Sequence, residues 1–364
     1  KYDVTLDKIS ADFKENWPKM NDKEKMKWKF QRYMQDYLAT ISSVDDNVGR
    51  VLDYLDETGL DDNTIVIYTS DQGFYLGEHG WFDKRWMYEE SFKMPFLIKN
   101  PRTIKAGTTS DAMIMNVDFA PTLLSMVEIE PPDYYHGLPF EGLFKSKDDR
   151  EYIHAAADRF DEYYDQIRAV RDKQYKYLRN YNTDKPYYLP LEYRERMNSM
   201  QELLLLEKEG KLNENQMQWF RKSKPEEELF DTFSDPHELR NLAKEPNFEK
   251  KLIELRKECD RWIQDIDDKG FMLETDLIET FWPDKKQPKT AEPIITIIDG
   301  MLHITCETDG AVIGYRYRPS DIKPHLGWRP YTKPFKVDGK QEVELISHRI
   351  GFLPSLIIKY ESEI

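Results

Sequence analysis

The sequence has only two cysteines, Cys259 and Cys306, among 364 residues. Two thiols exclude a disulfide framework and a cysteine-rich zinc site. The sequence also lacks any run of about 18 apolar residues, so no membrane span is predicted. No signal peptide is recognisable. Because the chain opens at Lys1 within a polar, helix-like stretch, we expect further residues upstream.

Positive charge is in the minority, with 53 Lys and Arg against 68 Asp and Glu, and the formal net charge is −15. A field of this sign argues against a general binder of nucleic acid or anionic membranes. It leaves room for a local site that takes an anionic substrate. Hydrophobic residues make up 39% of the chain and aromatic residues 13%, which is enough for a globular fold.

The N-terminal part has the pattern of an α/β domain, which we assign to residues 1–150. Apolar residues recur at spacings of three and four from Tyr37 to Leu55, which predicts an amphipathic helix with Gly59 as its left-handed cap. The run Thr64–Tyr68 is apolar without alternation. Such a run predicts a strand that is buried on both faces, as in a parallel sheet.

Three further regions follow. Residues 151–282 predict a smaller α+β subdomain, with a hairpin of half-exposed strands at 168–178 and helices at 195–210 and 248–268. Residues 283–293 contain three prolines and predict a stiff linker. Five short β runs within 294–364, separated by turns such as Asp299-Gly300, predict a small β-sandwich module.

The chemically informative stretch begins where the first predicted strand ends. Asp71 and Gln72 are adjacent oxygen donors, which suit Ca²⁺, with Mg²⁺ as the alternative. His79 and Lys84 add an imidazole and a fixed cation nearby. A metal and a cation together can stabilise a multiply charged oxyanion ester in its transition state. The alternative is an ordinary strand-to-loop turn in which Asp71 caps a helix.

The whole string resembles the sulfatase family of the alkaline-phosphatase superfamily, whose members use a formylglycine nucleophile. The resemblance is carried by Ile65 to Gly73, by Leu76-Gly77-Glu78-His79-Gly80 and by Asp83-Lys84. It continues through Tyr88-Glu89-Glu90-Ser91, Asp118 to Leu124, Ile167 to Arg171 and Asp235 to Leu239. It implies an alkaline-phosphatase-like mixed sheet flanked by helices, of which this chain holds the C-terminal portion.

The resemblance also implies roles for single residues. Asp71 and Gln72 would be calcium ligands, and Lys84 would contact the sulfate and offset charge on the leaving oxygen. His79 would lie near the substrate rim as a second catalytic group. Glu78 would orient His79 or bind a sugar hydroxyl.

Two family features are missing, the first metal-binding acidic pair and the nucleophile motif. The nucleophile of sulfatases lies in a Cys/Ser-x-Pro-x-Arg motif, and no such motif occurs in this sequence. We therefore expect the formylglycine in an upstream part of the same catalytic domain, which would be the partner of this chain. The chain alone is predicted to be inactive.

The implied substrate is a sulfated saccharide of the glycosaminoglycan type or another sulfated glycan, with the sulfate position left open. Trp81 could stack on a sugar ring, although a place in the core is equally expected. Asp158, Arg159 and Arg168 could bind hydroxyls or a second anionic group, although surface salt bridges are the commoner use of such residues.

Two alternatives for the function stay open. One is a phosphonate or phosphate ester hydrolase of the same superfamily, and the other is a non-catalytic glycan-binding derivative of a sulfatase. Family habit favours a periplasmic or secreted location. The terminal module resembles the sandwich that follows chitobiase and hexosaminidase catalytic domains, where it would bind glycan through Trp328 and Tyr331 or serve as a structural cover.

Overall fold

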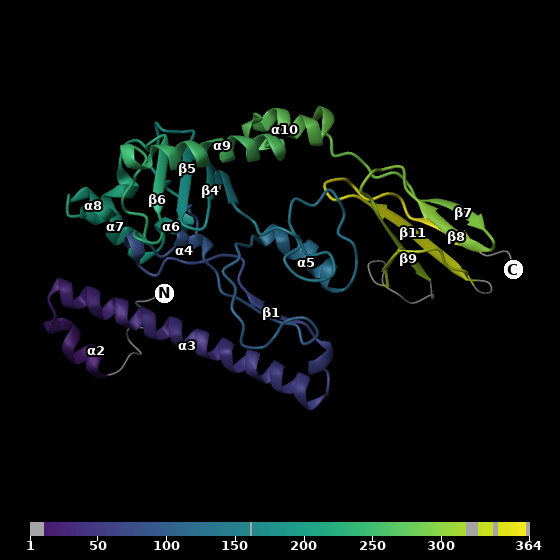
Figure 1. Cartoon of the computed structure of the whole chain (residues 1–364), viewed down its shortest axis with the longest axis horizontal. Coiled ribbons are helices and arrows are strands. Elements are labelled where there is room, and N and C mark those ends of the chain that lie inside the picture. Colours follow the sequence, from purple (N-terminus) through teal and green to yellow (C-terminus); the bar gives the residue numbers. More distant parts are fainter. Residues whose placement is uncertain (1–10, 161, 318–326, 338–340, 362–364) are drawn as a thin grey trace. The chain divides into compact units, whose positions relative to one another are not determined.

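The computed structural model describes residues 11–160, 162–317, 327–337 and 341–361. The chain divides into two compact units between Asp260 and Arg261 (Figure 1). The predicted boundaries after residue 150 and across 283–293 stay predictions. No helix in these ranges combines the length and apolar character that a bilayer crossing needs.

The longest helix is α3 (Asp22–Glu57), which forms one side of the first unit in Figure 1. It begins with a capping box, in which Asn21 Oδ1 accepts the Glu24 N–H at 3.0 Å and the Glu24 carboxylate accepts the Asn21 N–H at 2.9 Å. It ends at Glu57, and the φ of +67° at Gly59, two residues later, confirms the predicted left-handed cap. The helix therefore begins well before the periodic stretch that predicted it.

The apolar face of α3 is open in the described structure. Leu38, Ile41, Val44 and Val51 are between 45% and 59% exposed. A helix face of this kind normally packs on a core. It is thus a surface on which more protein could pack.

Strand β1 (Val66–Thr69) is confirmed, but its predicted environment is wrong. It pairs antiparallel with β2 (Phe96–Lys99), and both strands are only half-buried. Among the described residues, β2 is the only strand paired with β1, so one edge of β1 stays uncovered.

A four-stranded antiparallel sheet forms the centre of the first unit. Its strands lie in the order β3 (Ile153–Phe160), β4 (Tyr163–Arg171), β5 (Tyr175–Asn180) and β6 (Glu227–Asp231). The predicted hairpin is β4 and β5, with Arg171 opposite Lys176. The prediction of half-exposed strands is wrong, because both faces of this sheet are covered.

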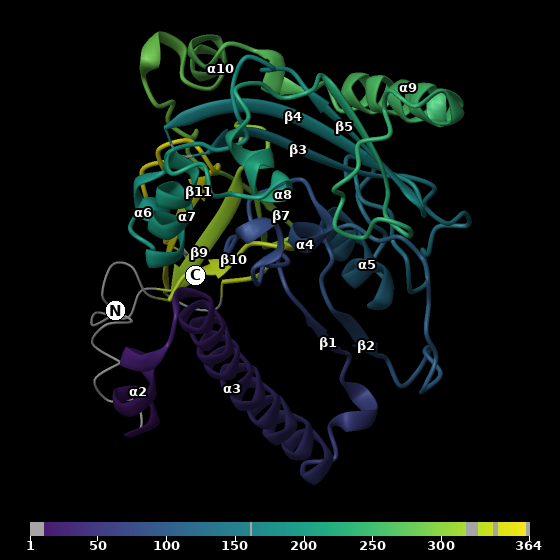
Figure 2. The same cartoon turned by 90° about the vertical axis from the view of Figure 1, so that its left-hand side faces the viewer.

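Helix α9 (Glu249–Asp265) covers one face and runs beside the sheet in Figures 1 and 2. It buries Leu252, Leu255 and Cys259. Ion pairs fix its position, with Arg256 on Glu227 of β6 and Asp260 on Arg179 of β5, each at 2.6 Å. The predicted helix at 248–268 is confirmed.

An aromatic cluster covers the other face. It joins strand residues Ile167, Ala169, Leu178 and Phe230 to the loop that follows β1 and to Trp219. The loop contributes Tyr75, Trp81, Trp86, Met87 and Tyr88, which are all at most 6% exposed. The candidate site is therefore built on a loop whose inner side is core.

Short helices complete this unit. They are α2 (Ala11–Asn16), α4 (Glu89–Phe92), α5 (Phe119–Met126), α6 (Glu192–Glu195), α7 (Asn198–Lys208) and α8 (Glu214–Met217). Asp118 precedes α5 as predicted, but it makes no side-chain cap to that helix. Its carboxylate instead accepts the N–H groups of Met115 and Leu138, each at 2.8 Å.

The second unit contains α10 (Glu274–Phe281) and two small sheets that share a core. One sheet is the hairpin β7 (Ile294–Ile298) and β8 (Met301–Thr305), and the other has the order β10 (Arg329–Pro330), β9 (Val312–Tyr317), β11 (Glu342–His348), β12 (Ile358–Glu361). Asp299 and Gly300 have φ of +51° and +73°, as a two-residue type I′ hairpin turn requires. The core joins residues of both sheets, including Leu302, Ile304, Ile313, Val343 and Leu345.

Of the two aromatic residues of the predicted glycan site, Tyr331 packs against this core, while Trp328 is half-buried and lies outside it. Tyr331 Oη accepts the N–H of Ile304 at 3.0 Å, and its ring packs beside Phe335. The guanidinium of Arg316 lies 4.4 Å from the ring centre of Trp328. These contacts favour the structural role for Tyr331, while a glycan contact by Trp328 stays a prediction.

Candidate active site

The first two candidate metal ligands lie directly after β1. Asp71 is exposed, and its carboxylate accepts a hydrogen bond from Ser70 Oγ at 3.3 Å, while Gln72 is half-buried. The next residue, Gly73, fixes the backbone by donating its N–H to Ser91 O at 2.7 Å. A Cβ at this position would lie 2.0 Å from the carbonyl oxygen of Glu90. Only glycine allows this approach, so residues 71–72 are held at the strand end.

The loop then folds back on itself, so that the residues before Lys84 pair with residues near the start of the loop. The N–H of Tyr75 donates to Asp83 O at 2.8 Å, and the N–H of Gly77 donates to Trp81 O at 2.7 Å. Because Lys84 directly follows Asp83, its backbone lies next to Tyr75, four residues after Asp71. Asp71 and Lys84 are both exposed. The loop is thus closed between residues 75 and 83, and the exposed side chains of Asp71 and Lys84 stand just outside its two ends.

His79 lies away from that end and inside the protein. Its side chain is 0% exposed and stacks on Tyr88 with ring centres 5.3 Å apart. Neither ring nitrogen makes a hydrogen bond within the described part of the chain, and Nε2 lies 3.7 Å from Glu90 Oε1. The imidazole is thus buried beside aromatic rings, and the predicted place of His79 near a substrate rim stays a prediction.

Glu78 has a different partner from the one predicted. Its Oε2 accepts the N–H of Leu76 at 2.6 Å, which stabilises the loop turn. The carboxylate that faces His79 is that of Glu90. Glu78 does border a small pocket of about 160 Å³, together with His79, Asn215, His237 and Leu239. A sugar hydroxyl at this rim stays a prediction.

Trp81 is part of the core. It is 1% exposed, with ring centres of Trp219 and Trp86 at 4.3 Å and 5.1 Å. The prediction that Trp81 stacks on a sugar is corrected, since neighbouring side chains already cover its ring.

The predicted second anion site is also largely internal. The side chain of Arg168 is 0% exposed and pairs with Asp158 at 2.9 Å, and it also donates to the carbonyl oxygen of Ile167. Arg168 is therefore corrected from substrate binding to an ion pair in which the arginine is buried. Asp158 is 38% exposed in its side chain, and Arg159 is exposed on β3, so a substrate role for these two stays a prediction.

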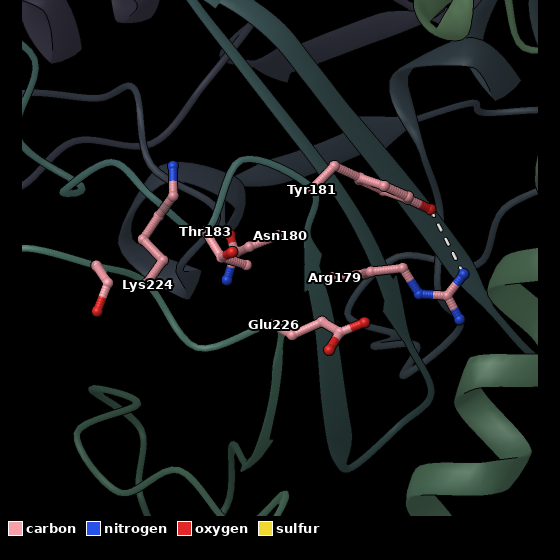
Figure 3. Close-up of a pocket in the computed structure, with 7 residues that line it drawn as sticks. Arg179, Asn180, Tyr181, Thr183, Lys224 and Glu226 are labelled. Carbon is pink, nitrogen blue, oxygen red and sulfur yellow. Dashed lines mark hydrogen bonds between the residues drawn. The ribbon is translucent and has the colours of Figure 1, made fainter.

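The larger described pocket lies elsewhere, at the ends of β5 and β6 (Figure 3). It has a volume of about 590 Å³ and is lined by Arg179, Asn180, Tyr181, Thr183, Ser223, Lys224 and Glu226. Arg179 donates to Tyr181 Oη at 3.4 Å across it. No predicted site residue lines this pocket, so sequence reasoning missed it.

Sequence reasoning also missed the residues that hold the loop. Glu90 contacts His79 and His237, and Arg194 pairs with Asp83 at 2.6 Å. These partners come from segments far along the chain, and His237 and Arg194 lie in no pattern that would link them to residues 79–90. The string Asp235 to Leu239 drew attention to His237 but gave it no role.

A complete metal site is not formed by the described residues, in which no group of three or more His, Cys, Asp and Glu side chains is placed to hold an ion. Asp71 nevertheless offers an exposed carboxylate, and Gln72 adds a neutral amide oxygen. Hard oxygen donors of mixed charge suit Ca²⁺. The pair fits part of a calcium site, for which other ligands would be needed.

Comparison with known sequences agrees with this arrangement. The profile of the sulfatase family matches residues 7–129, and the profile described as N-sulphoglucosamine sulphohydrolase, C-terminal, matches residues 77–218. An ulvan-active sulfatase of Formosa agariphila is 47% identical over 330 residues, which are 90% of this chain and 54% of that protein. An N-acetylglucosamine-6-O-sulfatase of Bacteroides thetaiotaomicron is 53% identical over 128 residues, or 35% of this chain and 23% of that protein.

A solved structure has a similar fold. It is that of a protein in complex with its substrate D-glucosamine-2-N,6-O-disulfate, with a TM-score of 0.54 and 30% identity over 74% of this chain and 51% of that one. This chain spans 54% of the length of the ulvan-active relative. The resemblance seen in residues 65–84 is confirmed: the chain belongs to the sulfatase family of the alkaline-phosphatase superfamily and resembles its carbohydrate sulfatases.

Proposed function

We propose that the complete protein hydrolyses sulfate esters on a carbohydrate, either a glycosaminoglycan-type chain or another sulfated glycan. The observation that carries this proposal is the loop closed between Tyr75 and Asp83, just outside whose two ends lie the exposed Asp71 and Lys84. The names of the two curated relatives, which are sulfatases of ulvan and of N-acetylglucosamine, support a saccharide as the substrate.

The residues of this chain would bind and neutralise the sulfate. The Lys84 ammonium would contact a sulfate oxygen and offset the negative charge that grows on the leaving oxygen. Asp71 and Gln72 would hold a calcium ion, with magnesium as the alternative. When bound, such an ion withdraws charge from the ester oxygens.

The attacking group would come from outside this sequence. No Cys/Ser-x-Pro-x-Arg motif is present, and the open apolar face of α3 offers a surface for the rest of a catalytic domain. We therefore propose a formylglycine in an upstream part of the protein, and no sulfatase activity for this chain alone. Sulfate release from a sulfated sugar by the isolated chain would contradict this part of the proposal.

The test uses the protein expressed from its complete reading frame. Lys84→Ala is expected to lower kcat for a sulfated sugar by roughly 10²–10³-fold, because it removes a charge that stabilises the transition state. Asp71→Ala is expected to lower both kcat and the calcium content per protein. Lys93→Ala is the matched control, since Lys93 is another exposed lysine of the same region. Equal activity of Lys84→Ala and Lys93→Ala would overturn the assignment.

The same preparations distinguish the alternatives. An aryl phosphonate hydrolysed faster than an aryl sulfate would favour the phosphonate hydrolase, and the absence of formylglycine from the peptide mass spectrum would favour a glycan-binding derivative. A periplasmic or secreted location is part of the proposal, and cell fractionation with an antibody to the protein tests it.

A further inference from the structure

Lys84 is exposed, but both of its neighbours in the sequence are anchored. Asp83 is 4% exposed, and its Oδ1 accepts the N–H of Lys84 at 2.6 Å. Arg85 stacks its guanidinium on Tyr193, 4.5 Å from the ring centre. The backbone at Lys84 is therefore held from both sides, while its side chain is free to reach a substrate.

The anchor of Asp83 is a buried ion pair. The Nε of Arg194 lies 2.6 Å from Asp83 Oδ2, and each side chain is only 2% exposed. A buried carboxylate without a partner would be costly, so the position of Asp83 depends strongly on Arg194. The two oxygens of Asp83 thus connect Arg194 to the backbone N–H of Lys84.

Arg194 is itself fixed by the aromatic cluster. Its guanidinium carbon lies 4.8 Å from the ring centre of Trp81 and 5.6 Å from that of Trp86. Contacts of a cation with aromatic faces favour this placement. Trp81 and Trp86 belong to the same loop as Lys84, so the loop closes around the arginine.

Tyr193 and Arg194 are neighbours on helix α6 (Glu192–Glu195). One short helix therefore holds residue 83 with one side chain and residue 85 with the next. We propose that α6 positions Lys84 for sulfate binding, with Arg194 and Tyr193 as positioning residues. This inference rests on the proposed function, because it gives Lys84 the role of contacting the sulfate.

These contacts hold the Cα of Lys84 in place while its side chain stays flexible. A lysine has four rotatable bonds, and it can meet a sulfate oxygen repeatedly only if its Cα stays in place. A displacement of about 1 Å at a reacting group can cost on the order of 10²-fold in rate. Loss of the α6 contacts is expected to act through Lys84 and through no other group.

The experiment is a double-mutant cycle in the protein expressed from its complete reading frame. Arg194→Ala is expected to lower kcat for a sulfated sugar by roughly 10–100-fold. Added to Lys84→Ala, it is expected to cause no further loss, because the lysine through which it acts is already gone. Arg194→Lys keeps a cation for Asp83 and is expected to recover most of the activity. Arg196→Ala, at an exposed arginine beside α6 that pairs with Glu192, is the control and should match the wild type.

A second pair of variants keeps the test decisive if Arg194→Ala does not fold. Tyr193→Leu removes the aromatic face under Arg85 and should lower kcat, again without adding to Lys84→Ala. Tyr193→Phe keeps that face and should retain wild-type kcat.

The outcomes separate the two proposals. If Lys84→Ala loses activity but the α6 variants do not, or if their losses add to that of Lys84→Ala, the positioning role is wrong and the proposed function stands. If Lys84→Ala keeps wild-type activity, the role of Lys84 is wrong and the positioning role falls with it. If the wild-type protein itself releases no sulfate from a sulfated sugar, the proposed function is wrong.

Discussion

The carboxylate of Glu90 lies 2.7 Å from Nδ1 of His237, which joins the end of the candidate-site loop to a segment that follows β6. Burial acts to raise the pKa of Glu90, but the imidazoles of His79 and His237 outweigh it and lower this pKa to about 2. The same contact raises the pKa of His237. The pair is therefore strongest when Glu90 is ionised and His237 is protonated.

This pair predicts a pH-dependent contribution to stability. The lowered pKa of Glu90 adds stability above its ordinary value of 4.5, which is lost as the pH falls towards 2. The raised pKa of His237 adds stability below its ordinary value of 6.5, which is lost as the pH rises through the folded-state pKa. His237→Gln should therefore lower Tm more at pH ~5.5 than at pH ~8.5. The exposed His136 provides the control His136→Gln. Equal losses at the two pH values would contradict the assignment.

The buried Glu228 should make the protein less stable as the pH rises, which is opposite to the effect of Glu90. Burial raises its pKa to about 8 from an ordinary value of 4.5, although a hydrogen bond from Asn180 Nδ2 at 2.8 Å acts to lower it. The folded state holds a proton that the unfolded state releases, so stability falls as the pH rises from 4.5 to 8. Glu228→Gln has the shape of the neutral acid and should lose less stability over this interval, by about 1 kcal/mol or more. Urea unfolding at the two ends of the interval measures it, and parallel pH profiles for variant and wild type would refute it.

Substitution of Gly73 should cause a steric clash next to the candidate metal ligands. Its substitution by alanine would place a Cβ 2.0 Å from Glu90 O, so the backbone of residues 71–73 must shift. Gly73→Ala should cost about 1–3 kcal/mol of unfolding free energy. In the complete protein it should also weaken calcium binding, which isothermal titration would measure. Gly49→Ala is the control, because a Cβ there meets nothing within 4 Å and alanine favours a helix. Equal effects of the two substitutions would contradict this account.

Several elements could be predicted from the sequence because their signals are local. The periodic apolar residues of α9, the glycine that ends α3 and the Asp299-Gly300 turn each depend on interactions within a few residues. The same holds for Asp71 and Gln72, which follow β1 directly. Such features need no knowledge of what the rest of the chain does.

The environments of Trp81, His79 and Arg168 could not be predicted in this way. The loop that carries Trp81 has no helical or strand periodicity, and its burial depends on Trp219 and on a sheet formed much later in the chain. Arg168 lies in a strand whose outer face looked solvent-exposed until α9 covered it. A charge pattern that resembles a binding site thus became an ion pair with a buried arginine through tertiary contacts alone.

The ammonium of Lys176 ties the loop segment 87–90 to strand β5. It is 1% exposed and lies 2.8 Å from Glu89 Oε1, 2.9 Å from Glu238 Oε1 and 3.1 Å from the carbonyl oxygen of Met87. Lys176→Met would leave the buried Glu238 and the partly buried Glu89 without this partner and should cost about 3–5 kcal/mol of unfolding free energy. Lys173→Met, at an exposed lysine that pairs with Asp111, should cost less than about 1 kcal/mol.

The pH dependence of the Lys176→Met loss separates charge from packing. Burial already raises the pKa of Glu238 to about 7, although Lys176 acts to lower it. Without the lysine, the protonated form of Glu238 is favoured further, so the cost of Lys176→Met should be smaller at pH ~5 than at pH ~8. Glu238→Gln should recover part of the loss at pH ~8, since it removes one of the unpaired charges. A cost that is the same at both pH values and is not reduced by Glu238→Gln would mean that Lys176 acts through the packing of its methylene chain.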